Sequence, residues 1–161
     1  MICSINPSKG PHLNGTAYMA NLGQRQFSPT DFNSEDHSVI EWINSRFNTI
    51  EPVLEAPGDR MYSGLSRISI FTGMPTLIGW SYQVSQQSGR EDVSGRSSVA
   101  NNIYSTLNDD EAIAALRQYN VRYVYIGAIE RASYGALSLE KFEKFCDPVF
   151  ISGSSVLYRV R

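Results

Sequence analysis

The side chains best suited to acid–base chemistry lie in the stretch Glu-Ala-Pro-Gly-Asp-Arg-Met-Tyr that begins at Glu55. Glu55 and Asp59 can act as an acid–base pair or bind sugar hydroxyls, and Tyr62 offers a stacking surface. The stretch follows a short apolar run, and open α/β sheets place ligand-binding loops at the carboxyl ends of their strands. The structural alternative, which we favour, is an ion pair with Arg60 or Arg67 that fixes a tight turn.

A second polar segment, Gly-Ala-Ile-Glu-Arg from Gly127, follows the strongest predicted strand. Glu130 and Arg131 would project from the same sheet edge as the first segment if both preceding strands are parallel, and the two loops would then form a cleft. The structural alternative is that Glu130 caps a helix or loop while Arg131 is solvated. Trp80 is suited to an aromatic wall for a sugar or a partner surface, or else to the core.

Other kinds of chemistry have little support in this sequence. His12 and His37 are the only histidines, and neither is spaced with a nucleophile and an acid as a catalytic triad requires. No pair of His or Cys has metal-ligand spacing, and no glycine-rich phosphate loop is present, so we predict neither a metal nor a cofactor. Cys146 lies between apolar residues, which predicts a small buried hydrophobe rather than a reactive thiol.

The elements that must position these residues alternate between helix and strand. Apolar spacing and capping residues predict helices over 35–47, 64–72, around 99–104, from the Asn108 cap to Tyr119, and over 138–145. Strands are predicted over 52–56, 76–80 and 121–127, and a hairpin over 149–151 and 156–160. This order predicts a three-layer α/β fold: a mainly parallel sheet flanked by helices, with a C-terminal antiparallel hairpin.

Length and composition fit a single globular domain. The chain has 161 residues, of which 42% are hydrophobic and 19% charged. We predict an irregular arm over 1–30, which is rich in Pro, Gly, Asn and Ser, and one α/β domain over 31–161. The net charge is −2 and most basic residues stand alone, which argues against a nucleic-acid partner. No apolar run reaches the roughly 20 residues of a membrane span, and the first residues lack the pattern of a signal peptide.

At these same segments the chain resembles the YYY-type polytopic membrane proteins, which are grouped near the GT-C type glycosyltransferases. The resemblance covers about residues 13 to 160 and consists of short stretches whose order and spacing agree. They are Leu-Asn-Gly-Thr-Ala-Tyr-Met at 13–19, Glu-Ala-Pro-Gly at 55–58, Ser-Arg-Ile-Ser at 66–69, Thr-Gly-Met-Pro-Thr at 72–76, Gly-Trp at 79–80, Tyr-Val-Tyr-Ile-Gly at 123–127, and Glu130, Arg131 and Tyr134.

The resemblance implies a soluble domain on the extracytoplasmic face, attached to a membrane-embedded, glycosyltransferase-like part of the same parent chain. It implies that the catalytic acid lies on loops of the membrane part and that a glycan or lipid-linked sugar is the ligand. The chain departs from the family pattern after Trp80. Gln83-Val84 and Gln86-Gln87-Ser88 stand where the family often has His-Glu and then Gln-Trp-Arg, and Asn14 replaces an acid. We therefore carry over no catalytic residue.

Three functions stay open at this point. The first is a domain that supports glycan transfer without catalysing it, so that only the parent protein would be an enzyme. The second is a freestanding small-molecule-binding or hydrolytic module with a cleft at the strand ends. The third is a protein-interaction module that uses the region of Trp80 and Tyr82. The candidate ligand-binding residues are Glu55, Asp59, Arg60, Tyr62, Arg67, Trp80, Glu130 and Arg131.

Overall fold

A computed structural model of the chain describes residues 33–47, 51–58, 64–81, 84, 86 and 90–161. The arm predicted over 1–30 lies outside these residues, so the predicted division at residue 31 stays a prediction. The elements are α1 (Ser34–Arg46), β1 (Val53–Leu54), α2 (Arg67–Thr72), α4 (Arg90–Ser105), α5 (Asp109–Gln118), β2 (Tyr123–Ile126), α6 (Ala128–Tyr134), α7 (Ala136–Glu140), α8 (Phe142–Phe145), β3 (Cys146–Ser152) and β4 (Ser155–Val160).

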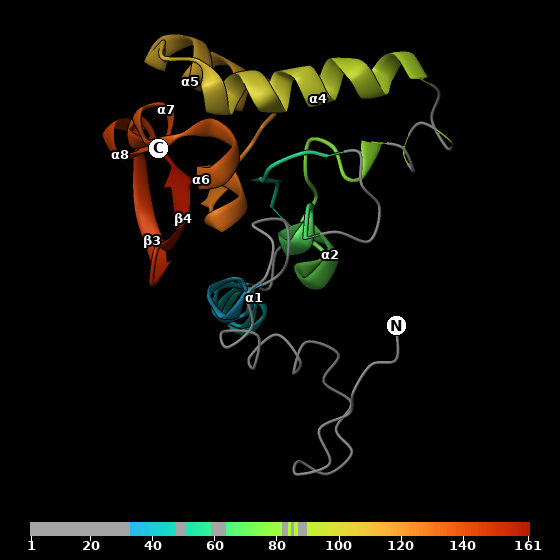
Figure 1. Cartoon of the computed structure of the whole chain (residues 1–161). Coiled ribbons are helices and arrows are strands. Elements are labelled where there is room, and N and C mark those ends of the chain that lie inside the picture. Colours follow the sequence, from blue (N-terminus) through green and yellow to red (C-terminus); the bar gives the residue numbers. More distant parts are fainter. Residues whose placement is uncertain (1–32, 48–50, 59–63, 82–83, 85, 87–89) are drawn as a thin grey trace.

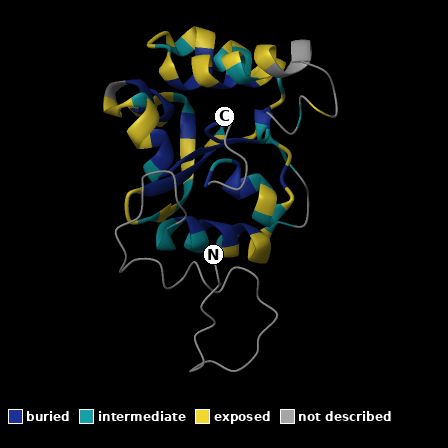
Figure 2. Ribbon diagram, turned by 45° about the vertical axis from the view of Figure 1, so that its right-hand side comes forward, coloured by how far each residue is buried: buried dark blue, intermediate teal, exposed yellow. Residues whose placement is uncertain are grey.

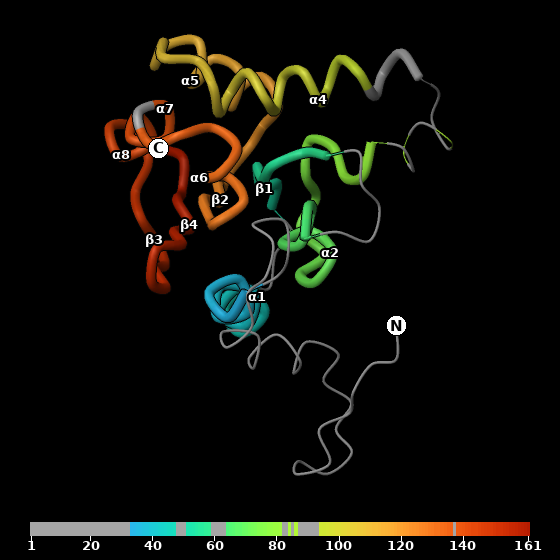
Figure 3. The backbone as a smooth tube through the Cα atoms, in the orientation of Figure 1, coloured from blue at the N-terminus to red at the C-terminus, as the bar shows by residue number. Residues whose placement is uncertain are grey.

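The fold has the three layers that the sequence predicts. Helices α4 and α5 lie on one side of the sheet and helices α1 and α2 on the other (Figure 1). The backbone trace in Figure 3 shows β1 and β2 between these two groups of helices. The four strands have the order β1-β2-β4-β3, and the C-terminal pair β3–β4 forms the predicted antiparallel hairpin.

The prediction of a mainly parallel sheet is wrong in its detail, because the sheet is mixed. Strands β1 and β2 are parallel, but β4 pairs with both β2 and β3 in antiparallel fashion. The strand expected over 76–80 contributes two isolated parallel bridges, from Thr76 to Val53 and from Trp80 to Gly58. This segment bonds to its neighbour near its two ends alone, so it adds no full parallel strand.

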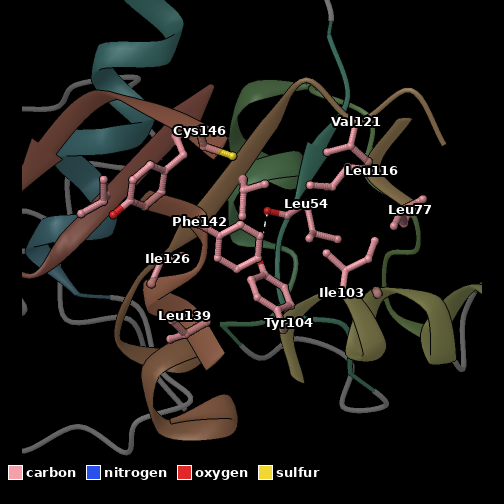
Figure 4. Close-up of a cluster of buried hydrophobic side chains, with 14 residues drawn as sticks. Leu54, Leu77, Ile103, Tyr104, Leu116, Val121, Ile126, Leu139, Phe142 and Cys146 are labelled. Carbon is pink, nitrogen blue, oxygen red and sulfur yellow. Dashed lines mark hydrogen bonds between the residues drawn. The ribbon is translucent and has the colours of Figure 1, made fainter. Parts of the chain in front are cut away.

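Alternation along the strands divides the interior into two clusters. Val53 and Tyr125 pack with α1 and α2, whereas Leu54 and Ile126 face α4 and α5, as expected when successive strand side chains point to opposite faces. Strands β1 and β2 are buried throughout, whereas β3 has exposed residues. In Figure 2 the upper helices carry many exposed and intermediate residues. Figure 4 shows the α4–α5 cluster, with Leu54, Ile103, Tyr104, Leu116, Val121 and Phe142 among its members.

Capping residues fix the helix starts close to their predicted positions. Asn33 and Asp36 form a reciprocal capping box at the start of α1. Asn108 accepts hydrogen bonds from two backbone N–H groups at the start of α5. Asn120 has the predicted left-handed conformation, with φ of 53°. Among the described residues, no helix is both long enough and apolar enough to cross a bilayer.

Two predictions in the C-terminal half, one of a helix and one of a loop, are wrong. The single helix expected over 138–145 is divided into the short helices α7 and α8, which meet at Lys141. The Lys141 ammonium turns inward to the end of α4. The segment expected to be a loop at 127–131 is the start of helix α6. Its single turn of apolar spacing, with Ile129 buried, was too short to indicate a helix from the sequence.

Candidate functional site

The carboxyl ends of β1 and β2 lie side by side, as the sequence predicts for two parallel neighbouring strands. Glu55 directly follows β1, and Glu130 lies in the first turn of α6 after β2. The backbone N–H of Ala56 donates to Glu130 Oε1 at 3.0 Å, which joins the two segments. Glu55 and Glu130 are 1% and 0% exposed, so in this conformation they lie inside the protein.

Arg67 is the centre of this region and is fully buried. Its Nε donates to Asp36 Oδ1 and its Nη2 donates to Glu130 Oε2, each at 2.7 Å. The guanidinium lies 4.8 Å from the centre of the Tyr125 ring, a cation–π distance. The Tyr125 hydroxyl in turn donates to Asp36 Oδ1. One arginine therefore joins α1, α2, β2 and α6 through two carboxylates and a phenol.

The ion pair favoured from the sequence joins Glu55 or Asp59 to Arg60 or Arg67. Arg67 does form ion pairs, but with Asp36 and Glu130. Asp59 and Arg60 lie outside the described residues. The Glu55 carboxylate instead accepts the backbone N–H groups of Ile68 at 2.8 Å and Ser69 at 2.9 Å. These N–H groups lie in the first turn of α2 and have no acceptor within the helix. Glu55 therefore caps α2 although it belongs to a different segment, directly after β1.

Ser66 occupies the N-cap position of α2 but does not cap the helix, and Glu55 caps it instead. Ser66 has a left-handed backbone with φ of 60° and makes no capping bond with its side chain. Its buried Oγ has no hydrogen-bond partner among the described residues. A serine at positive φ is strained, and such strain persists only where the surroundings determine the conformation. Here the surroundings are the buried neighbour Arg67 and the capping carboxylate of Glu55.

Glycine is required beside the arginine at the start of α6. The Gly127 N–H donates to Glu130 Oε2 at 2.9 Å and closes the first turn of the helix. A Cβ at Gly127 would lie 2.7 Å from both Arg67 Nη2 and the Tyr125 hydroxyl. This is shorter than any real Cβ contact, so a larger residue would displace the arginine or the tyrosine.

Burial and charge set the protonation of this cluster. Burial alone would raise the pKa of Glu130, but the charge and hydrogen bonds of Arg67 outweigh it, so this pKa is lowered. For Glu55 burial prevails over the charge of Arg67, and its pKa is raised. Burial also raises the pKa of Tyr125. The oxygens of Glu130 are all occupied by structural donors, which suits an internal support better than proton transfer.

The remaining candidates are placed differently. Trp80 is half-buried, and its Nε1 donates to the Leu65 carbonyl at 2.9 Å. Arg131 is exposed and donates to the Ser154 carbonyl at 3.0 Å from Nε and 2.6 Å from Nη2, in the turn between β3 and β4. Asp59, Arg60 and Tyr62 lie outside the described residues, as does Tyr82. Ligand binding by the eight candidates stays a prediction.

Two partners of the buried arginine were missed from the sequence. Asp36 was interpreted as a first-turn acid of α1, a role that it also performs, and Tyr125 as an apolar strand residue. Neither residue carries a local signal for its contact with Arg67, which lies 31 positions from Asp36. Glu130 carries a local signal for the helix start alone, because a glutamate at the third helical position can accept the N–H of the capping residue, here Gly127.

One further prediction from the sequence concerns Cys146. Cys146 is fully buried in the α4–α5 cluster, as predicted, and burial raises the pKa of its thiol to about 12. Within the described ranges, no three His, Cys, Asp or Glu side chains come together in a way that could hold a metal ion.

The architecture defines an α/β domain with a mixed sheet and a buried charged cluster at the parallel strand ends. Comparison with solved structures places it beside the C-terminal globular domain of an oligosaccharyltransferase from Archaeoglobus fulgidus. The TM-score is 0.51 and the identity 10%; the match covers 78% of this chain and 95% of that domain. The chain thus shares the fold of that oligosaccharyltransferase domain, as the sequence resemblance implied. No known family profile and no curated protein matches the chain.

Proposed function

We propose that this chain is the extracytoplasmic C-terminal domain of a membrane glycosyltransferase of the GT-C type, and that it supports glycan transfer without catalysing it. The observation that carries the proposal is the shared fold, which spans 95% of an oligosaccharyltransferase C-terminal globular domain. The partner is then the membrane-embedded part of the same parent chain, and a glycan or lipid-linked sugar is the ligand of the whole protein.

The buried cluster supports the second half of the proposal. A catalytic acid must approach its substrate to within hydrogen-bond distance or through one water. Glu130 is fully buried with both oxygens bonded to Arg67 and to backbone N–H groups, and Glu55 is bonded to the start of α2. These acids hold the strand-end segments in place, so the domain contributes shape and the transfer chemistry comes from the membrane part.

Localisation of the full reading frame tests the first half. The full-length native protein, tagged after Arg161, should stay with the membrane after alkaline carbonate extraction. The tag should be digested by protease added from the extracytoplasmic side. A tagged product no longer than these 161 residues that fractionates with soluble proteins would contradict the proposal.

Transfer assays on membranes with the full-length protein test the second half. With labelled lipid-linked sugars from the native host as donor, Glu55→Gln and Glu130→Gln should keep the transfer rate per folded molecule within about threefold of the wild type. General acid–base catalysis typically contributes about 10²–10⁴-fold. A loss of about 100-fold or more in either variant, at an unchanged amount of folded protein, would assign chemistry to this domain instead.

A further inference from the structure

A hollow of about 150 Å³ opens on the side of the sheet that carries α5 and α8. It is separate from the buried Arg67 cluster and includes none of the eight residues selected from the sequence. Three segments distant in sequence form its wall, namely α5, α8 and the end of β4. The lining residues are Ile113, Arg117, Lys144, Phe145, Val160 and Arg161.

Half of the lining side chains are cationic. Lys144 donates to Asp109 at 2.8 Å, and Arg161 donates to Asp147 at 2.7 Å. The Arg161–Asp147 pair is solvent-exposed, and an exposed pair is weak enough to exchange partners. The Lys144 side chain is exposed too, but Asp109 is only 33% exposed and its Oδ1 is buried. Arg117 is exposed and has no anionic partner within the described part of the chain. The rim of the hollow therefore has one uncompensated positive charge.

Two features prepare the rim for an incoming anion. The Arg161 guanidinium is held by the carbonyls of Lys144 at 2.9 Å and Cys146 at 3.2 Å, so less side-chain freedom remains to be lost on binding. The Arg161–Asp147 pair is exposed, so a ligand can engage Arg161 while water solvates Asp147. Lys144 keeps its bond to Asp109, whose Oδ1 is buried without a partner among the described residues, and contributes its charge to the rim.

The rest of the wall is apolar. Ile113, Phe145 and Val160 are each partly exposed at the hollow rather than fully covered by other side chains. A volume of about 150 Å³ equals that of an engineered apolar cavity that binds benzene. The space therefore suits one ring or one branched alkyl group, with the three cations around it.

We propose that this hollow binds a small organic oxyanion, a carboxylate or phosphate attached to one ring or branched alkyl group. The apolar group contacts Ile113, Phe145 and Val160, and the anionic end contacts Arg117 at the rim with Lys144 and Arg161. An arginine fork matches the geometry of a carboxylate or phosphate. This inference does not depend on the proposed glycosyltransferase role.

Nuclear magnetic resonance titration of the 161-residue chain tests the proposal with phenyl phosphate as the probe. The amide signals of residues in α5, α8 and the end of β4 should shift and saturate below about 10 mM, while those of α1 stay unchanged. Inorganic phosphate has the anionic group without a ring, and benzyl alcohol has the ring without an anionic group. Each should bind at least about tenfold more weakly, because one charge-assisted contact or one buried ring contributes about that factor.

Arg117→Ala should weaken phenyl phosphate binding by about tenfold while leaving the spectrum of the rest of the chain intact. Arg117→Gln is the second variant, since it keeps the length of the side chain and removes the charge. Arg46→Ala is the matched control, because Arg46 is an exposed arginine on α1, on the other side of the sheet.

Several results would overturn the proposal. They are absence of saturable shifts around the hollow, equal affinity for phenyl phosphate and benzyl alcohol, equal affinity for inorganic phosphate, or equal weakening by Arg46→Ala. The comparison of probes on the wild-type chain decides the matter even if both Arg117 variants fail to fold. Benzoate in place of phenyl phosphate then shows which of the two oxyanions the hollow prefers.

Discussion

Among the described residues, each side of the sheet buries one cation, and the two are accommodated in opposite ways. Arg67, on the α1–α2 side, meets the carboxylates of Asp36 and Glu130. Lys141, on the α4–α5 side, is 3% exposed. Its ammonium donates to the carbonyls of Tyr104 at 2.8 Å and Thr106 at 2.6 Å. The first cation is neutralised by two full charges, and the second caps the end of helix α4 with neutral acceptors.

The pKa values follow this difference. Burial would lower the pKa of Arg67, but the charges of Glu130 and Asp36 raise it well above its usual value. Burial lowers the pKa of Lys141 to about 8, against which Asp109 and Glu111 have a smaller effect. A guanidinium cannot give up its proton in a protein, so its burial demands carboxylates, whereas a buried lysine has the option of becoming neutral.

The largest effect is expected where the ionic cluster is broken. Arg67→Met leaves Asp36 and Glu130 buried without a counter-charge, and it should lower the free energy of unfolding at pH 7 by about 3–5 kcal/mol. The folded-state pKa of Glu130 is lowered, so its stabilising effect is present above its unfolded pKa and is lost as pH falls through the folded value. Urea denaturation at several pH values should therefore show the deficit shrinking in acid.

The control for this change is a second substitution in the same cluster. Adding Glu130→Gln to Arg67→Met removes one of the stranded charges, so the double variant should be less destabilised than the sum of the two single variants by at least about 1 kcal/mol. Strict additivity would show that Arg67 and Glu130 do not depend on each other, contrary to their 2.7 Å contact.

A core truncation on the other side of the sheet should cost somewhat less and should not depend on pH. Leu116 of α5 is fully buried in the cluster of Figure 4. Leu116→Ala should lower the free energy of unfolding by about 3 kcal/mol, since it removes buried methyl groups and leaves a cavity. Urea denaturation at the same pH values measures this loss of stability. A deficit that changes with pH as much as that of Arg67→Met would remove the contrast between the two sides.

The same contrast explains what could be predicted from the sequence. On the α4–α5 side, the Asn108 cap, the apolar spacing of α5 and the β-branched and aromatic run of β2 are local patterns, and the structure confirms the elements that they predict. Apolar burial is not directional, so periodicity alone shows which face turns inward.

The charged side of the sheet could be predicted only in part. The meeting of Glu55 and Glu130 at one edge follows from parallel strands, and an ion pair with Arg60 or Arg67 was expected in the first segment. The choice of partner depends on geometry, because Asp36 reaches Arg67 from a helix 31 residues earlier. Capping of α2 by Glu55 likewise depends on the placement of β1 against that helix, which no local spacing encodes.

A smaller effect is expected from one hydroxyl that contacts both parallel strands. Tyr104 is fully buried, and its hydroxyl proton is shared between the carbonyls of Leu54 at 3.1 Å and Tyr125 at 2.8 Å, one in each parallel strand. Tyr104→Phe keeps the ring and removes the donor, so it should cost about 1–2 kcal/mol in thermal or urea unfolding. An unchanged stability would show that the hydroxyl does not help to hold β1 against β2.

The smallest effect is expected in the pH dependence of stability that Lys141 causes at the end of α4. The pKa of Lys141 is about 8 in the folded protein, against an ordinary value of 10.5. A base with a lowered folded pKa makes folding more favourable as pH rises from the folded toward the unfolded value. Stability should therefore increase between pH 8 and 9.5, on the order of 1 kcal/mol or less after solvent screening.

Lys141→Met should abolish this increase, whereas Lys144→Met, which changes an exposed lysine of α8, should preserve it. Urea denaturation at closely spaced pH values measures the slope in each variant. A slope that survives in Lys141→Met would mean that the ammonium keeps its proton at the end of α4. Lys141 would then resemble Arg67 as a permanently charged support, and the difference between the two sides would rest on their acceptors alone.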